Sequence, residues 1–183
     1  VGLIKDYKKM VTMDLKDIDN IVLVIGKTEG HIDQSIFARN ILDEKNGPPP
    51  EINLFNEKNN GETLLKLINK GYVKSAHDVS LGGILTAVSK MCIKGNKGIK
   101  IKKPKYLINE IEYFFSEDQG RYIVEIDKKA LKMVTEILNE NAVHYDELGT
   151  ISPDELNIHD KTKVSIDELR TSNTNWLINF MSN

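Results

Sequence analysis

The sequence predicts an α/β or α+β domain in which helices cover a sheet. Strand-like and helix-like segments alternate along the whole chain, which is typical of layered folds that mix the two kinds of element. The run 20–26 is apolar, rich in β-branched residues and closed by glycine, as in a strand buried on both faces. The length of 183 residues suits one domain, because a chain of this size buries about 70% of its unfolded surface and needs no disulfides.

The N-terminal quarter is predicted to hold a shorter strand within 5–19, the strand at 20–26 and one helix. Asp33 or Ser35 would cap that helix, and its inward face would consist of Ile36, Phe37, Ile41 and Leu42. Three prolines in 46–50 fix the backbone and remove donors, so this stretch is predicted to be a rigid surface connector. A docking site for a proline-recognising partner is the alternative.

In the middle of the chain, a second helix is predicted to begin at Asn60 or Thr63 and to end at Gly71. Strands are predicted at 73–79 and 98–101. The helix between these two strands carries one apolar stripe, formed by Ile84, Leu85, Val88, Met91 and Cys92.

The C-terminal half continues the alternation. Residues 107–115 indicate a helical turn or a loop packed on the core. The remaining predicted strands lie at 121–126, at 143–151 and, as two short pieces, within 156–166. Asp127 would cap a helix whose inward residues are Leu131, Val134, Ile137 and Leu138. The last helix is predicted over 167–181, with the apolar residues Leu169, Trp176, Leu177 and Phe180.

Composition excludes several classes of function. Twenty-five basic and 27 acidic residues leave a net charge of −2, which excludes the strongly basic footprint of a nucleic-acid-binding protein. Cys92 is the only cysteine, so a disulfide framework and a multi-cysteine zinc site are excluded, and its apolar stripe indicates a core residue. The four histidines lack metal-site spacing. Without a bilayer-spanning run or a signal peptide, we expect a cytoplasmic protein with no membrane or nucleic-acid partner.

The most informative stretch is 75–83, where a predicted strand runs through small residues into a helix. Glycines there allow a backbone to approach a ligand closely, and free N–H groups at a helix start favour an anion. His77 and Asp78 supply polar groups at the end of the strand. From these residues alone an ordinary turn is favoured over a phosphate cradle, because the GxGxxG spacing and a P-loop lysine are missing.

Three segments, in the same order, resemble motifs of phosphoribosylformylglycinamidine synthase, the large synthetase subunit of purine biosynthesis. The segment 76–83, AHDVSLGG, resembles AHDVSDGG. The segment 25–35, IGKTEGHIDQS, resembles IGETxGHLGQS, and 115–122, FSEDQGRY, resembles FGEDQGRY. The resemblance covers most of residues 1–151, and three ordered motifs make it specific.

The resemblance implies that the chain is the C-terminal B domain of such a synthase, and an opening Val1 in place of methionine also hints at a piece of a longer protein. Residues 1–19 would be the tail of the preceding domain and the first strand region, and 20–183 a single domain. Its implied fold is a three-layer α-β-α sandwich with a mixed sheet and partial ferredoxin-like topology. The alternatives are a non-catalytic scaffold or interaction domain, or another synthetase of the same superfamily.

The resemblance also implies an activity, cofactors and partners. The whole enzyme would carry out the ATP- and glutamine-dependent amidation of formylglycinamide ribonucleotide in de novo purine biosynthesis. ATP and magnesium would bind mainly in upstream domains that are not in this chain, so no residue here is expected to be catalytic or to bind metal. The implied partners are those upstream domains, the glutaminase subunit and the small bridging subunit, and the isolated chain should have no turnover.

Within the motifs, eight residues are candidates for lining a ligand cleft: His77, Asp78, Ser80, Gly82, Gly83, Glu117, Gln119 and Arg121. His77 could instead be a buried histidine bonded to backbone, and Asp78 a helix cap or loop residue. Arg121 could hold a phosphate with two hydrogen bonds, or form an ion pair with Glu117 or Asp78. His31 is expected to be a solvated loop residue.

Four positions depart from the family's motifs. Leu81 stands in place of an aspartate and Lys27 in place of a glutamate, while Asp33 and Ser116 replace glycines. If these positions contact a ligand, the departures weaken its binding. If they only shape turns, the departures change little.

Overall fold

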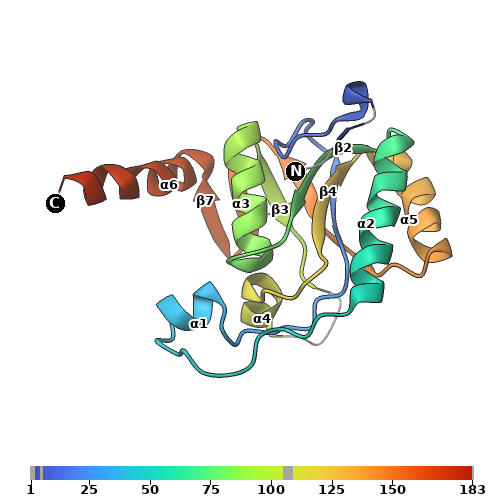
Figure 1. Cartoon of the computed structure of the whole chain (residues 1–183). Coiled ribbons are helices and arrows are strands. Elements are labelled where there is room, and N and C mark those ends of the chain that lie inside the picture. Colours follow the sequence, from blue (N-terminus) through green and yellow to red (C-terminus); the bar gives the residue numbers. More distant parts are fainter. Residues whose placement is uncertain (1–2, 5, 105–108, 183) are drawn as a thin grey trace.

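The computed structural model describes residues 3–4, 6–104 and 109–182, and contains one seven-stranded sheet (Figure 1). The strands, in the spatial order β2-β4-β1-β5-β3-β6-β7, are β1 Ile21–Ile25, β2 Val73–Asp78, β3 Gly98–Ile101, β4 Tyr122–Ile126, β5 Tyr145–Ser152, β6 Glu155–Ile158 and β7 Thr162–Ser165. The helices are α1 Ile36–Asn40, α2 Leu54–Asn69, α3 Gly83–Gly95, α4 Glu110–Phe115, α5 Leu131–Glu140 and α6 Ile166–Met181. The pair β3–β6 is parallel and the other pairs are antiparallel, so the predicted mixed sheet is confirmed.

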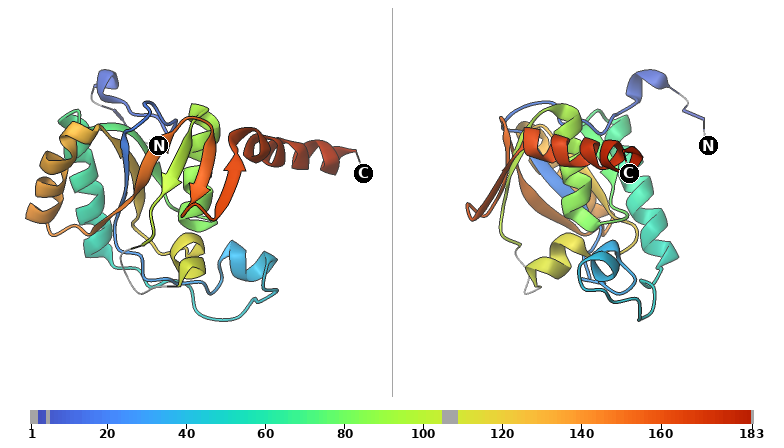
Figure 2. Two further views of the ribbon diagram at one scale, coloured as in Figure 1. Left: turned by 180° about the vertical axis from the view of Figure 1, so that it is seen from behind. Right: turned by 90° about the vertical axis from the view of Figure 1, so that its left-hand side faces the viewer.

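Helices cover both faces of the sheet and form three layers, as predicted. α2 and α5 lie on one face, and α3 and α4 lie on the other (Figures 1 and 2). β1 joins the two cores because its side chains alternate between them: Val22 and Val24 belong to the α3 side, whereas Ile21, Leu23 and Ile25 belong to the α2 side. The buried apolar run therefore forms an interior strand that contributes side chains to both cores.

Four strands and two helices follow the ferredoxin-like order. Along the chain they run β1-α2-β2-β4-α5-β5, and across the sheet the strands lie β2-β4-β1-β5. The elements α3, β3 and α4 are inserted between β2 and β4, while β3, β6 and β7 extend the sheet beyond β5. The insertion supplies the third layer, which explains why the likeness to the ferredoxin-like topology is partial.

The predicted start of α2 is wrong by about two turns. Asn53 caps this helix and its side chain accepts the N–H of Asn56. Asn60 and Thr63, the predicted caps, are buried inside the helix, where the Asn60 side chain donates to the carbonyl of Gly120. A cap-type residue can serve inside a helix when its side chain finds a tertiary partner.

The predicted strand within 5–19 is also absent from the described residues of that stretch, which hold a 3₁₀ turn at Tyr7–Lys9 and a single bridge from Thr12 to Ser75. Leu15 nevertheless packs into the α3-side core. The division of the chain after residue 19 remains a prediction. Among the described residues, no helix has the length and apolarity needed to cross a membrane.

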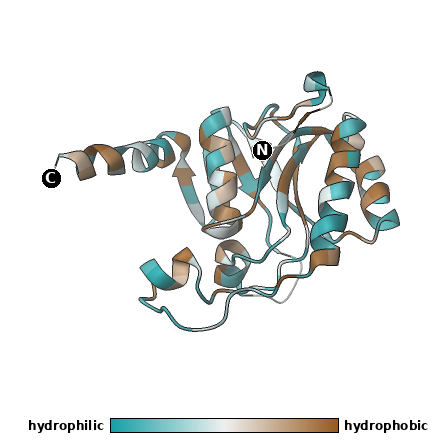
Figure 3. Ribbon diagram, in the orientation of Figure 1, coloured by the Kyte–Doolittle hydropathy of each residue, from teal (hydrophilic) through white to brown (hydrophobic). Residues whose placement is uncertain are grey.

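Two predicted apolar faces are exposed. In α1, Phe37 stacks on Phe115 with ring centroids 4.8 Å apart, but Ile41 is 68% exposed. In α6 the outer residues Trp176 and Phe180 are also exposed, and Figure 3 shows these turns extending beyond the body. Apolar periodicity alone does not say which face finds a partner.

A buried carboxylate holds the N-terminal segment to the sheet. Glu125 lies on β4 with no exposed surface. Its oxygens accept the backbone N–H groups of Lys16 and Asp17 at 2.8 and 3.0 Å. They also accept the Asn20 amide at 2.7 Å and the Ser75 hydroxyl at 3.0 Å. The sequence gives no hint of this role, because one acidic residue in a strand normally faces solvent.

We predict that Glu125→Ala lowers the free energy of unfolding by about 2–4 kcal/mol, because it leaves four buried or half-buried donors without an acceptor. Urea denaturation followed by circular dichroism measures this loss. The control Glu140→Ala changes an exposed residue at the end of α5 and should shift stability by no more than about 0.5 kcal/mol. Equal effects of the two substitutions would contradict the anchoring role.

Candidate functional site

The three motif segments meet at one end of the sheet. Tyr122, the first residue of β4, pairs with Ile25 at the end of β1 and with Asp78 at the end of β2. The loops that follow β1 and β2 and the loop that precedes β4 therefore lie side by side, near α1 and α4 (Figure 1). Residues that are far apart in the sequence are thus brought together by antiparallel pairing.

Asp118 holds the loop that follows β1. Its carboxylate is buried and accepts three successive backbone N–H groups: Glu29 at 2.9 Å, Gly30 at 3.0 Å and His31 at 3.0 Å. Hydrogen bonds to a charged acceptor are stronger than those between neutral groups. This carboxylate therefore fixes the path of a loop that has no regular secondary structure.

Glu117 joins the other two segments. Its Oε1 atom accepts the N–H of Gly82, at the start of α3, and the N–H of Ile36, at the start of α1, both at 2.8 Å. These donors belong to helix starts, where backbone N–H groups lack partners within the helix. One carboxylate oxygen thus positions two helices, and this predicted cleft residue is used inside the structure.

Arg121 is also used internally, since only 1% of its surface is exposed. Its guanidinium donates to the carbonyls of Asp118 at 3.1 Å and Ser116 at 2.8 Å, and to the hydroxyl of Thr28 at 3.1 Å. Burial lowers the pKa of this group, and the nearby charge of Asp118 opposes that shift. Its ion-pair partner is Asp118, 3.7 Å away, and not the predicted Glu117 or Asp78.

Two motif glycines allow backbone segments to touch. Gly26 has φ +97°, and a Cβ there would lie 2.6 Å from the carbonyl oxygen of Gly120. Gly83 has φ +71°, and a Cβ there would lie 2.6 Å from the carbonyl oxygen of Phe114. Any side chain would separate the motifs. The N–H groups of Gly82 and Gly83 are bonded to Glu117 and to the carbonyl of Ser80, as expected for a turn.

The other candidates lie nearer to solvent. The His77 ring is 18% exposed, and its Nδ1 atom lies 3.0 Å from Oδ1 of Asp78, so its partner is this side chain and not backbone. Its Nε2 atom is buried with no hydrogen-bond partner among the described residues. Asp78 is exposed and does not cap α3. Ser80 and Gln119 are exposed as well.

A hollow of about 930 Å³ opens beside the motifs, between the loop after β1 and the start of α2. Of the eight candidates, its lining includes Gln119. Its charged or polar lining also includes Lys27, Glu29, His31, Glu57, Asp118 and His144. The hydrogen bond to Glu29 raises the pKa of Lys27. His31 is not simply solvated, because its Nε2 atom lies 2.9 Å from the carbonyl of Pro48 and ties the proline connector to the hollow.

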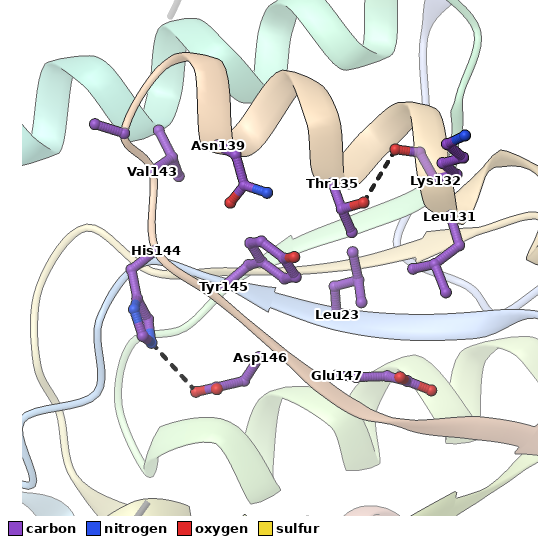
Figure 4. Close-up of a pocket in the computed structure, with 11 residues that line it drawn as sticks. Leu23, Leu131, Lys132, Thr135, Asn139, Val143, His144, Tyr145, Asp146 and Glu147 are labelled. Atoms are coloured by element: carbon purple, nitrogen blue, oxygen red, sulfur yellow. Dashed lines mark hydrogen bonds and ion pairs between the residues drawn. The ribbon is translucent and has the colours of Figure 1, made fainter. Parts of the chain in front are cut away.

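A second hollow, of about 790 Å³, lies between α5 and β5 (Figure 4). Leu23 and Leu131 supply apolar surface, while Asn139 and Tyr145 point toward the space. His144 lines both hollows, so they adjoin there. Sequence reasoning missed this site. The sequence carries no clear signal for it, because 145–151 reads YDELGTI and its polar and apolar residues do not alternate strictly.

Comparisons with known proteins find matches in sequence and in fold. Residues 18–161 match the family described as AIR synthase related protein, C-terminal domain. The chain is 73% identical to the phosphoribosylformylglycinamidine synthase subunit PurL of Pelagibacter ubique over 183 residues, which are 100% of this chain and 25% of the relative. It is 40% identical to PurL of Bartonella henselae over 99% of this chain and 24% of the relative. The chain thus spans about a quarter of the length of these curated relatives.

Solved structures share the fold. Thermotoga maritima PurL complexed with FGAR superposes with a TM-score of 0.73 and 19% identity, over 89% of this chain and 30% of that chain. Thiamine-monophosphate kinase from Stenotrophomonas maltophilia gives a TM-score of 0.55 and 12% identity, over 81% of this chain and 52% of that chain. At these identities the likeness shows the fold alone.

We predict that Asp118→Asn destabilises the protein by about 1–3 kcal/mol. The new amide replaces one carboxylate oxygen with an NH₂ group, which cannot accept a hydrogen bond from the backbone N–H groups that face it. Urea denaturation measures the loss, and trypsin cleavage after Lys27 should become faster as the loop is released. Asp154→Asn, a change at an exposed residue, serves as the control and should leave both readings unchanged. Unaltered cleavage in Asp118→Asn would argue against the clamp.

Replacing Ser116, which departs from the family's motif, is expected to stabilise the protein rather than destabilise it. The Ser116 hydroxyl is buried and has no hydrogen-bond partner among the described residues. Ser116→Ala should therefore raise the free energy of unfolding by about 1 kcal/mol. The matched control is Ser152→Ala, which removes a hydroxyl that donates to Glu155 at 3.0 Å and should lower stability by about 1 kcal/mol. Thermal unfolding of both variants checks the contrast, and a loss of stability in Ser116→Ala would refute it.

Proposed function

The chain belongs to the family of AIR synthase related protein C-terminal domains, and from this membership we propose that it is the C-terminal domain of a phosphoribosylformylglycinamidine synthase. The observation that carries the proposal is the convergence of the three segments that resemble this synthase's motifs. Glu117, Asp118 and Arg121 bind them into one unit at the end of the sheet.

The whole enzyme would convert formylglycinamide ribonucleotide to formylglycinamidine ribonucleotide. Glutamine supplies ammonia, and ATP activates the amide oxygen so that nitrogen replaces it, with release of ADP and phosphate. The chain would work with the upstream domains of the same synthetase, a glutaminase subunit and a small bridging subunit, in the cytoplasm. These roles extend beyond the quarter of the relatives that the chain spans.

In this proposal the chain contributes one wall of a cleft. The hollow of about 930 Å³ beside the motifs offers Lys27, His31 and Gln119 to whatever lies against it. ATP and magnesium would bind in upstream domains. Among the described residues no group of three or more His, Cys, Asp or Glu side chains could hold a metal ion, and the Arg121 guanidinium already donates to three protein acceptors.

A second role, that of a non-catalytic scaffold, is favoured by the internal use of four candidates: Gly82, Gly83, Glu117 and Arg121. Leu81, which replaces a family aspartate, has an exposed aliphatic side chain, and such a side chain offers no acceptor at the glycine pair. The two roles differ at the hollow. A scaffold leaves the substrate KM of the whole enzyme unchanged when Lys27 and Gln119 are replaced by alanine, whereas a cleft wall does not.

A chimeric enzyme tests the proposal. In the Pelagibacter ubique relative, the matching quarter is replaced by this chain, and formation of the amidine is measured with glutamine, ATP and the partner subunits. We expect the chimera to keep activity within about tenfold of the relative, because at 73% identity most contacts with the rest of the enzyme should be kept. A relative that lacks this quarter should be inactive, as should the 183-residue chain alone. A folded but inactive chimera, or amidation by the chain alone, would refute the proposal.

A further inference from the structure

The last helix is fixed to the domain only at its beginning. Ser165 and Glu168 form a capping box at the start of α6. Ile166 is buried and Leu169 packs against the α3-side core. Arg170 adds a hydrogen bond from its guanidinium to the side chain of Asn96, just after α3. The first turn and a half is therefore held by packing, a cap and a polar contact.

The outer turns of α6 continue the same face into solvent. Leu169 and Trp176 are seven residues apart, and Trp176 and Phe180 are four apart, so all three share one side of the helix. The rings of Trp176 and Phe180 lie 6.5 Å apart. The outer apolar residues of this face and its flank are 50–75% exposed: Trp176, Leu177, Phe180 and Met181. Figures 2 and 3 show these turns projecting clear of the sheet and its covering helices.

The outer turns also lack charge. Residues 171–183 contain no Asp, Glu, Lys or Arg, although 28% of the whole chain is charged. A solvated helix normally carries charged residues on its outward side. An exposed apolar stripe on an uncharged helix is therefore typical of a surface that is covered in the working protein.

We propose that the outer turns of α6 dock in an uncharged apolar groove on another domain of the same polypeptide. That domain would lie in the three quarters of the relatives' length that this chain does not span, so the identity of the occupant rests on the proposed function. The family match ends at residue 161, before α6, whereas the match to the Pelagibacter ubique relative covers all 183 residues. α6 thus lies outside the residues matched by the family model but inside the match to this PurL relative.

The size of the surface favours a domain of the same chain over a second copy. The four outer side chains expose roughly 500 Å², taking about 200 Å² for a whole large side chain. Docking would bury this area and an equal area on the partner surface, roughly 1,000 Å² in total. That total lies within the range of interfaces between domains of one chain. Stable complexes of separate chains bury about 1,200–2,000 Å². An interface smaller than this can still be stable within one chain, because the covalent link raises the effective concentration of the partner surface.

Hydrogen exchange of α6 tests this docking in two molecules. In the 183-residue chain alone, the amides of 171–181 should exchange rapidly, and sedimentation should show a monomer across the concentration range. In the chimeric synthase the same amides should exchange at least about tenfold more slowly. Phe180→Asp in the chimera should remove this protection. Asn175→Asp introduces the same charge on the opposite side of the helix and should retain it.

The outcomes separate the docking from the proposed function. An active chimera whose α6 exchanges as fast as in the isolated chain would overturn the docking and leave the synthase assignment standing. An inactive chimera with a protected α6 that Phe180→Asp exposes would support the docking and count against the assignment. A concentration-dependent dimer of the isolated chain, with protection of 171–181, would show that the occupant is a second copy and would overturn the proposal.

Discussion

Carboxylates that accept backbone N–H groups are the interaction on which the functional end of this protein depends. The loops after β1 and β2 have no regular structure to bind their own amides, and unpaired amides away from water are costly. Asp118 satisfies three of them and Glu117 two more. At the opposite end, Glu125 does the same for the segment that leads into β1. Arg121 balances the charge of this cluster from inside the fold.

This constraint changes how the motifs are understood. Acidic and basic residues in a shared motif suggest ligand contacts, yet all three in FSEDQGRY, namely Glu117, Asp118 and Arg121, bind the protein itself. The glycines serve the same purpose, because Gly26 and Gly83 let the three segments approach within the distance that a side chain would occupy. The motif residues that line the adjacent hollow include Lys27, His31 and Gln119. The motifs therefore build a rigid support, and a few residues at its rim face the space beside it.

Much of the fold could be predicted from sequence because the strands have strong local signals. The runs at 20–26 and 121–126 are rich in β-branched residues, and both form interior strands of the sheet. The start of α2 could not be predicted, since Asn60 and Thr63 look like caps and only tertiary contacts show that they are buried. The anchoring role of Glu125 could not be predicted either, because it depends on contacts with the segment before β1. At the site, the motif resemblance brought the right segments together, but it could not show that Arg121 faces inward or that Asp118 is its partner.

The most direct test of this account is native-state hydrogen exchange at three amides bound by the motif carboxylates: His31, Ile36 and Gly82. If Glu117 and Asp118 join the segments into one unit, these amides should open with a common free energy, within about 1 kcal/mol of one another and close to that of global unfolding. If Gly82 or His31 opens several kcal/mol below the others, the segments move independently, and the carboxylates do not hold them together.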